Sequence, residues 1–219
     1  MTTVALPEPA YRAVPSQFPP ISAFESVTSS DDLAAAMELE GWTNDRLVAE
    51  RLARLPRHEW VFGVPNASVV MSSFLHAALT GQRFTGPHPE LGAWYAAMAI
   101  NTALAEVSHH LRREAFNTGM PEMRGKYRMY SCSLSGAYKD IRGRGAECPG
   151  LYHAADYSAS QAFGEALRPH GDGIVYDSLR HVGGTNVVAY RTHNVGAVTQ
   201  LYHYELTVPA TGKIVIRRL

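Results

Sequence analysis

The chain has 219 residues, 46% hydrophobic and 18% charged, a composition typical of one globular domain spanning residues 1–219. Twenty Lys and Arg residues balance twenty Asp and Glu residues, and this zero formal net charge argues against binding to nucleic acid or an anionic membrane. No window approaches the roughly 18 apolar residues of a membrane span, and the first residues lack the pattern of a secretory signal, so we expect a soluble, cytoplasmic protein.

The first part of the chain predicts an extended arm followed by helices. Prolines interrupt the start, so we expect a flexible arm over residues 1–10 and an edge strand or extended segment around "YRAV". Two helices are predicted next, over residues 31–39 and between Thr43 and Pro56. The apolar run at residues 65–81 is compatible with a short helix or a buried strand, and its pattern does not decide between them.

The centre of the chain has clearer patterns. "GAWYAAM" at residues 92–98 predicts a buried strand, and "NTALAEVSHHLRREAFNTG" predicts a helix with Asn101 as its N-cap and Gly119 just past its end. "KYRMYSCSL" at residues 126–134 alternates as a strand does.

A helix and several strands are predicted for the rest. Ser158 with Gln161 three residues later resembles a capping box, which predicts a helix start. Glycine-rich turn signals separate four expected strands, "GIVYDSL", "TNVVAYR", "VTQLYHYELTV" and "KIVIRRL". The sum of these elements is an α+β fold.

Five residues are candidates for chemistry, and each has a structural alternative. Arg83 lies in a turn-rich loop where a guanidinium can clamp phosphate, or can simply face water. Tyr95 is a pocket or a core aromatic residue, and Glu106 is a carboxylate at a cleft or one that complements the helix dipole. Ser158 is a helix cap that could also attract phosphate, and Ser178 at a strand end is a second candidate serine.

No cofactor or metal motif occurs. The patterns GxGxxG, GxxxxGK[ST], HExxH and GxSxG are missing, and the ten histidines are scattered, so we expect no metal. Cys132 and Cys148 form no CxxC pair and are interpreted as reduced, incidental thiols.

Taken in order along the chain, these segments resemble one family, the RES domain family, which is named for its Arg, Glu and Ser residues. The resemblance runs from about residue 10 to the end. It rests on "YR" at Arg12, "RF" at Arg83, "WYAA" at Tyr95, "TALAEV" at Glu106, "DYSASQAFGEALR" and "GIVYDSLRHVGGTNVVAYR".

The resemblance implies a fold like that of ADP-ribosyltransferase toxins, with a mixed β-sheet core and surrounding helices. RES proteins are the toxin halves of bacterial toxin–antitoxin pairs whose antitoxins are Xre-type helix-turn-helix proteins, and characterised members consume NAD by hydrolysis or phosphorolysis. Some relatives ADP-ribosylate a protein instead, and a non-catalytic partner of a helix-turn-helix protein is a third reading. The acceptor (water, inorganic phosphate or protein) and the oligomeric state, a homo-oligomer included, stay open.

The resemblance also assigns roles to residues. Arg12 and Arg83 would hold the pyrophosphate and ribose of NAD, and Tyr95 would stack on or shape the nicotinamide pocket. Glu106 would bind the hydroxyls of the nicotinamide ribose, and Ser158 would orient the dinucleotide. Arg83, Tyr95 and Glu106 are thus the predicted catalytic set, while the role of the long segment between Arg12 and Arg83 is open.

Overall fold

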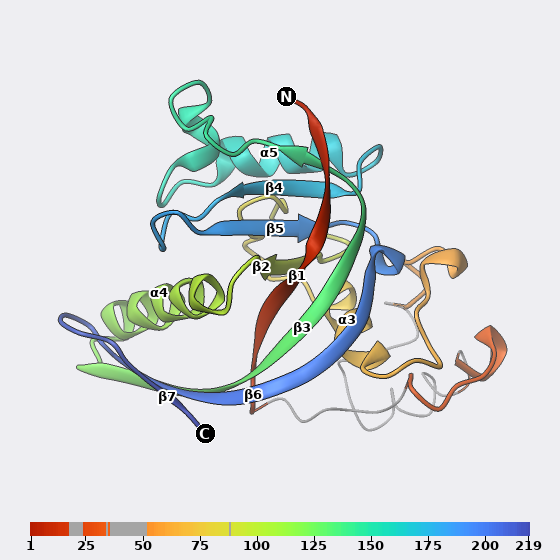
Figure 1. Ribbon diagram of the computed structural model, residues 1–219, viewed down its shortest axis with the longest axis horizontal. Coiled ribbons are helices and arrows are strands. Elements are labelled where there is room, and N and C mark those ends of the chain that lie inside the picture. Colours follow the sequence, from red (N-terminus) through yellow and green to blue (C-terminus); the bar gives the residue numbers. More distant parts are fainter. Residues whose placement is uncertain (18–23, 34, 36–51, 88) are drawn as a thin grey trace.

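A computed structural model describes residues 1–17, 24–33, 35, 52–87 and 89–219 (Figure 1). The helices predicted over residues 31–39 and between Thr43 and Pro56 fall largely outside these residues. Seven strands of the described chain form one mixed sheet, ordered β1-β2-β5-β4-β3-β6-β7. The strands are β1 (Thr3–Pro15), β2 (Trp94–Ala97), β3 (Glu122–Asp140), β4 (Gly173–Asp177), β5 (Thr185–Ala189), β6 (Val195–Pro209) and β7 (Val215–Arg218).

Helices accompany this sheet, so the predicted α+β class with a mixed sheet and surrounding helices is confirmed. The α-helices are α3 (Ala67–Leu75), α4 (Ile100–Thr118) and α5 (Ser158–Leu167). The described residues also include three short 3-10 turns, η2 (Arg57–Glu59), η3 (Pro149–Tyr152) and η4 (Thr192–Asn194). The run at residues 65–81, which the sequence left undecided, therefore contains a helix, and the four expected C-terminal strands are all present.

Strand β1 joins the two halves of the sheet. Tyr11 pairs with Ala97 of β2, and the next residue, Arg12, pairs with Tyr130 of β3. Figure 1 shows β2, β4 and β5 running across the molecule while β1, β3 and β6 curve past them. Since β3 also pairs with β4, at Lys139 and Ile174, the sheet closes on itself through β1.

The prediction of a flexible arm over residues 1–10 was wrong for residues 3–10, which belong to β1. Thr3 pairs with Lys139 of β3, and the ladder shifts register between Leu6 and Ala10. That irregular stretch contains the prolines of "LPEPA", which have no N–H to donate. The prolines therefore interrupt the ladder without ending the strand.

Helix α4 follows β2 almost directly. Its N-cap is Ala99, which has extended backbone and no capping side chain, so the predicted N-cap at Asn101 was wrong. Asn101 is the second residue of the helix, because the extended chain of β2 runs on to Ala99 before it turns. The predicted end is confirmed, since Gly119 has φ 69°, a left-handed conformation that favours glycine.

Helix α5 also starts without the capping box that the sequence predicted. Its N-cap is Tyr157, with no side-chain hydrogen bond, and Ser158 is the first helical residue. The carboxylate of Asp156 accepts the Ser158 N–H at 2.9 Å, and the side chain of Gln161 donates to Thr80 O at 3.2 Å. The carboxylate of Asp156, two residues before Ser158, has thus taken the capping role expected of Ser158.

Candidate active site

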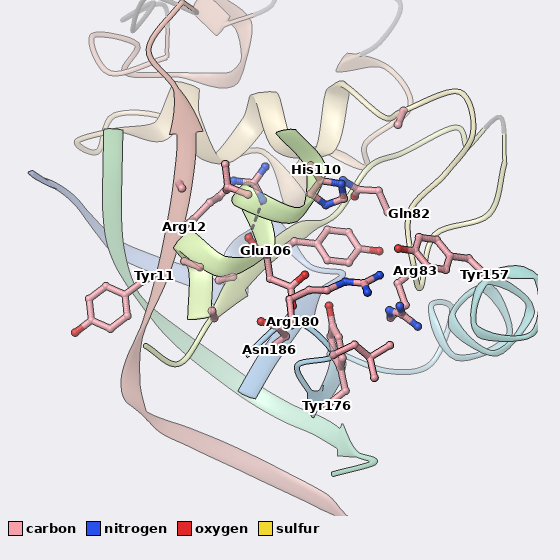
Figure 2. Close-up of a pocket in the computed structure, with 18 of the residues that line it drawn as sticks. Tyr11, Arg12, Gln82, Arg83, Glu106, His110, Tyr157, Tyr176, Arg180 and Asn186 are labelled. Atoms are coloured by element: carbon pink, nitrogen blue, oxygen red, sulfur yellow. Dashed lines mark hydrogen bonds between the residues drawn. The ribbon is translucent and has the colours of Figure 1, made fainter. Parts of the chain in front are cut away.

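A pocket of about 410 Å³ lies between helix α4, strands β1, β2 and β5, and the loops before β2 and after β4 (Figure 2). This volume is within the range of small-molecule sites. Its charged and titratable lining comprises Arg12, Arg83, Glu106, His110, Arg113 and Arg180, and its tyrosines are Tyr11, Tyr95, Tyr157 and Tyr176. Four of the residues predicted from the sequence, Arg12, Arg83, Tyr95 and Glu106, therefore meet in one pocket.

Glu106 is held by two hydrogen bonds to one of its carboxylate oxygens. The Ser178 hydroxyl donates to Oε1 at 2.7 Å, and the Asn186 side-chain amide donates to the same atom at 2.6 Å. Among the described residues, none forms a hydrogen bond with Oε2. One oxygen therefore fixes the orientation of the carboxylate, and the other is left for a ligand in the pocket.

The direction of the Ser178 hydroxyl is fixed in turn by the backbone. Ser178 follows the end of β4, and its Oγ accepts the N–H groups of Arg180 at 3.1 Å and His181 at 3.0 Å. With its lone pairs engaged by these amides, the hydroxyl directs its proton toward Glu106. Asn186, on the neighbouring strand β5, is only 4% exposed, so its amide is equally constrained.

Arg83 is presented by a tight turn. The backbone of Gln82 and Thr85 is bonded in both directions, which places Arg83 at the tip. Its guanidinium donates to the carbonyls of Leu151 (3.1 Å) and His153 (3.0 Å) and lies 4.5 Å from the ring centre of Tyr157. These contacts use one edge of the guanidinium and keep the group at the pocket wall.

Tyr95 supports the same turn. Its hydroxyl lies 2.8 Å from Thr85 Oγ1 and accepts the N–H of Phe84 at 3.2 Å. Burial raises the pKa of Tyr95 to about 12, so the hydroxyl keeps its proton at neutral pH. The residue therefore lines the pocket with its ring while its hydroxyl fixes the segment that carries Arg83.

Arg12 reaches the pocket from β1. Its guanidinium donates to Tyr95 O at 2.9 Å and lies 4.7 Å from the ring centre of Trp94, while its buried Nε has no hydrogen-bond partner among the described residues. Burial lowers the pKa of Arg12 to about 10, which still leaves it cationic at neutral pH. A cation with an unused buried donor is suited to an anionic ligand.

Comparison with known sequences identifies the family. The sequence model of the RES domain matches residues 51–209. The chain belongs to the RES domain family, a family of enzymes. A relative named y4oC from Sinorhizobium fredii, described as an uncharacterized protein, is 27% identical over 210 residues, which cover 93% of this chain and 84% of the relative. The match to the RES domain includes Arg83, Tyr95, Glu106 and Ser178, and Arg12 lies before it.

Of the two candidate serines, the RES domain brings Ser178 and not Ser158 to the glutamate. Ser158 is exposed at the start of α5 and does not line the pocket. Ser178 is bonded to Glu106 although 72 residues separate them in the sequence.

Several pocket residues of this RES domain were missed from the sequence. His110 and Arg113 follow Glu106 at intervals of four and seven on α4, so the helical period alone would have placed all three on one face. Arg180 comes two residues after Ser178. No sequence pattern marked Asn186 as a site residue, because an asparagine in a strand does not by itself indicate a functional role.

The described residues of this RES domain include neither a cluster of metal ligands nor a membrane-spanning helix. In the part of the chain that the structure describes, no three His, Cys, Asp or Glu side chains lie together as a metal ion would need. No described helix has the length and apolar character to cross a membrane.

Proposed function

We propose that the chain cleaves the bond between ribose C1′ and the nicotinamide nitrogen of NAD, with water or inorganic phosphate as the acceptor, and so depletes cellular NAD. We further propose that it acts as the toxin of a type II toxin–antitoxin pair, with an Xre-type helix-turn-helix antitoxin as its partner. The observation that carries the activity is the position of Glu106, one carboxylate oriented by Ser178 and Asn186 in a pocket with four arginines.

The pocket charges suit the two ends of the reacting part of NAD. Guanidinium groups such as those of Arg12 and Arg83 match the pyrophosphate, because each can donate two parallel hydrogen bonds to phosphate oxygens. The free oxygen of Glu106 can accept hydrogen bonds from the ribose hydroxyls. Without these bonds the Glu106 carboxylate could turn toward a neighbouring arginine and form an ion pair that fills the pocket. The hydrogen bonds from Ser178 and Asn186 keep the carboxylate in its present orientation.

The chemistry needs a fixed negative charge. As the C1′–N bond breaks, positive charge develops on the ribose ring, in an oxocarbenium-like transition state. A carboxylate already oriented toward the ring stabilises that state more than the ground state, which is the requirement for catalysis. The electron pair of the bond passes to the pyridinium nitrogen, so nicotinamide leaves as a neutral ring and needs no general acid.

The test is to incubate the purified protein with NAD, with and without inorganic phosphate, and to separate the products by chromatography. Free nicotinamide with ADP-ribose means hydrolysis, and a phosphorylated ADP-ribose means phosphorolysis. Glu106→Gln keeps an oxygen for the bonds from Ser178 and Asn186 but removes the charge, so we expect nicotinamide release to fall on the order of 100-fold or more with no loss of fold.

Two other functions make different predictions in this assay. A protein ADP-ribosyltransferase would transfer label from NAD to protein and leave little free ADP-ribose. A non-catalytic partner of a helix-turn-helix protein would release no nicotinamide, and Glu106→Gln would then leave growth inhibition in cells unchanged. A neighbouring gene for a small helix-turn-helix protein would support the toxin role.

A further inference from the structure

Tyr176 lines the pocket with a hydroxyl that no described residue satisfies. The residue lies on β4 and is only 7% exposed. In the part of the chain that the structure describes, no group forms a hydrogen bond with its hydroxyl, although most buried tyrosine hydroxyls have a partner. A buried donor that lines a cavity and has no protein partner indicates the position of an acceptor on a ligand.

The register of the sheet directs Tyr176 toward the same side as the residues that orient Glu106. Tyr176 pairs with Asn186 of β5, and Ser178 follows two residues later, just past the end of β4. Paired residues, and residues two apart, lie on one face of a sheet. The three side chains therefore point the same way, and two of them, Ser178 and Asn186, are bonded to Glu106.

The ring of Tyr176 is held by the turn that carries Arg83. The fully buried ring of Phe84 packs against it edge-on, with 4.8 Å between the ring centres. This packing keeps the Tyr176 ring from turning out of the pocket. Figure 2 shows its hydroxyl directed toward the space among Glu106, Arg83 and Arg180.

The hydroxyl of Tyr176 keeps its proton at neutral pH, so it can donate a hydrogen bond. Burial raises the pKa of Tyr176 well above its usual value, Tyr95 and Glu106 raise it further, and Arg83 lowers it. The hydroxyl is thus close enough to respond to both the carboxylate and a guanidinium of the pocket. It is a neutral donor between an anion and a cation.

Arg83 and Arg180 are held by neighbouring carbonyls. Arg83 donates to His153 O at 3.0 Å, and Arg180 donates to Ala154 O at 2.7 Å. Adjacent anchors bring the two guanidinium groups to one wall of the pocket, where together they match a phosphate group. In the proposed reaction the pyrophosphate lies at this wall, and the nicotinamide ribose lies at Glu106.

We propose that the Tyr176 hydroxyl donates a hydrogen bond to NAD, at the phosphate that carries the nicotinamide ribose. This inference rests on the proposed cleavage of NAD. That phosphate joins the ribose to the rest of the dinucleotide, and the hydroxyl faces the space between Glu106 and the two arginines. Because the charge of the phosphate does not change as the C1′–N bond breaks, Tyr176 binds the ground state and the transition state alike. It is a substrate-binding residue that sets KM more than kcat.

The experiment compares Tyr176→Phe with wild type and with Tyr138→Phe. Tyr138 on β3 is fully buried, its hydroxyl also lacks a hydrogen-bond partner among the described residues, and it does not line the pocket. It is therefore a matched control for the loss of an unpaired buried hydroxyl. KM and kcat for nicotinamide release from NAD are measured, together with inhibition by ADP-ribose and by ADP and the melting temperature of each protein.

Tyr176→Phe should raise the KM for NAD about ten-fold or more, since a hydrogen bond to a charged group is lost, and should leave kcat nearly unchanged. The inhibition constants of ADP-ribose and ADP should rise by a similar factor, because both keep the phosphate in question. The melting temperature should stay equal or rise, since the free protein loses a hydroxyl that has no partner. Tyr138→Phe should match wild type in KM, kcat and inhibition.

Four results would overturn this role of Tyr176 while the proposed function stands. They are an unchanged KM for Tyr176→Phe, a lower melting temperature of that variant, an effect on ADP-ribose that is absent with ADP, and failure of ADP to inhibit wild type. The second would indicate support of the fold, and the third a contact with the ribose. If wild type released no nicotinamide from NAD, with or without inorganic phosphate, the proposed function itself would fail, so the two failures are distinguishable.

Discussion

The hydroxyl of Tyr95 lies 2.8 Å from Oγ1 of Thr85, so a residue of strand β2 is tied directly to the turn that presents Arg83. Both residues line or support one wall of the pocket, and the same hydroxyl also accepts the Phe84 N–H. The tie explains why a buried strand carries a tyrosine at this position where phenylalanine would pack as well. Tyr95 is thus a positioning residue for Arg83 as well as part of the pocket lining.

Tyr95→Phe should loosen that turn. The Phe84 N–H would lose its partner, and an unsatisfied buried donor costs about 1–3 kcal/mol. We expect a lower melting temperature and a higher KM for NAD, with a smaller change in kcat, because Arg83 would be less well fixed while Glu106 is untouched. Thr85→Val in the same background measures the coupling, and additive effects of the two changes would contradict the tie.

The two serines can be separated by matched substitutions. Ser178→Ala removes the hydrogen bond that orients Glu106, so kcat for nicotinamide release should fall about ten-fold or more. Ser158→Ala changes an exposed side chain outside the pocket and should have little effect. If the Ser158 variant is the slower of the two, the orienting role of Ser178 is wrong.

Arg12 should matter although it lies before the segment matched to the RES domain. Arg12→Gln removes a cation that the pocket holds between Trp94 and Tyr95, and we expect the KM for NAD to rise about ten-fold or more. Titration of the rate with NAD measures this. A KM equal to that of the wild type would contradict the binding role proposed for Arg12.

His109 should make stability depend on pH. Burial, with a contribution from nearby cations, lowers the pKa of His109 to about 4, whereas in the unfolded chain it is about 6.5. The unfolded state therefore binds the proton first. The contribution of neutral His109 to the stability of the folded protein is therefore complete above about pH 6.5 and is lost as the pH falls toward 4.

His109→Gln cannot titrate, so its melting temperature should fall less than that of wild type between pH 7.5 and pH 5. Thermal unfolding at several pH values measures the difference. Parallel curves for the two proteins would show that the histidine does not carry the effect.

Much of the fold could be predicted because the signals are local. The alternating strands, the apolar stripe of α4 and the glycine at its end depend on residues a few positions apart. The two N-cap predictions that were wrong also depended on local signals. Asn101 and Ser158 are residue types that favour N-caps, but the observed N-caps are Ala99 and Tyr157. Cap composition indicates that a helix begins nearby, and tertiary contacts decide where.

The site was less predictable because its hydrogen bonds are not local. Glu106 is bonded to Ser178 and Asn186 across 72 and 80 residues of sequence, and no spacing rule covers such pairs. The family resemblance brought Arg83, Tyr95 and Glu106 to attention, but it could not distinguish between two serines in the C-terminal half. The helical period of α4 could have predicted that Glu106, His110 and Arg113 share one face, but the sequence analysis did not include His110 and Arg113 among the site residues.

The pairing of β1 has a consequence for when the pocket exists. Among the described strands β1 comes first along the chain, yet the partners of Tyr11 and Arg12 are Ala97 and Tyr130, and the residues that orient Glu106 come later still. Such long-range pairing makes folding slow, because the chain loses conformational entropy in bringing distant segments together before their contacts stabilise it. A growing chain therefore has no assembled pocket until Asn186 has been added, so any activity of this pocket can begin only after most of the chain has been synthesised.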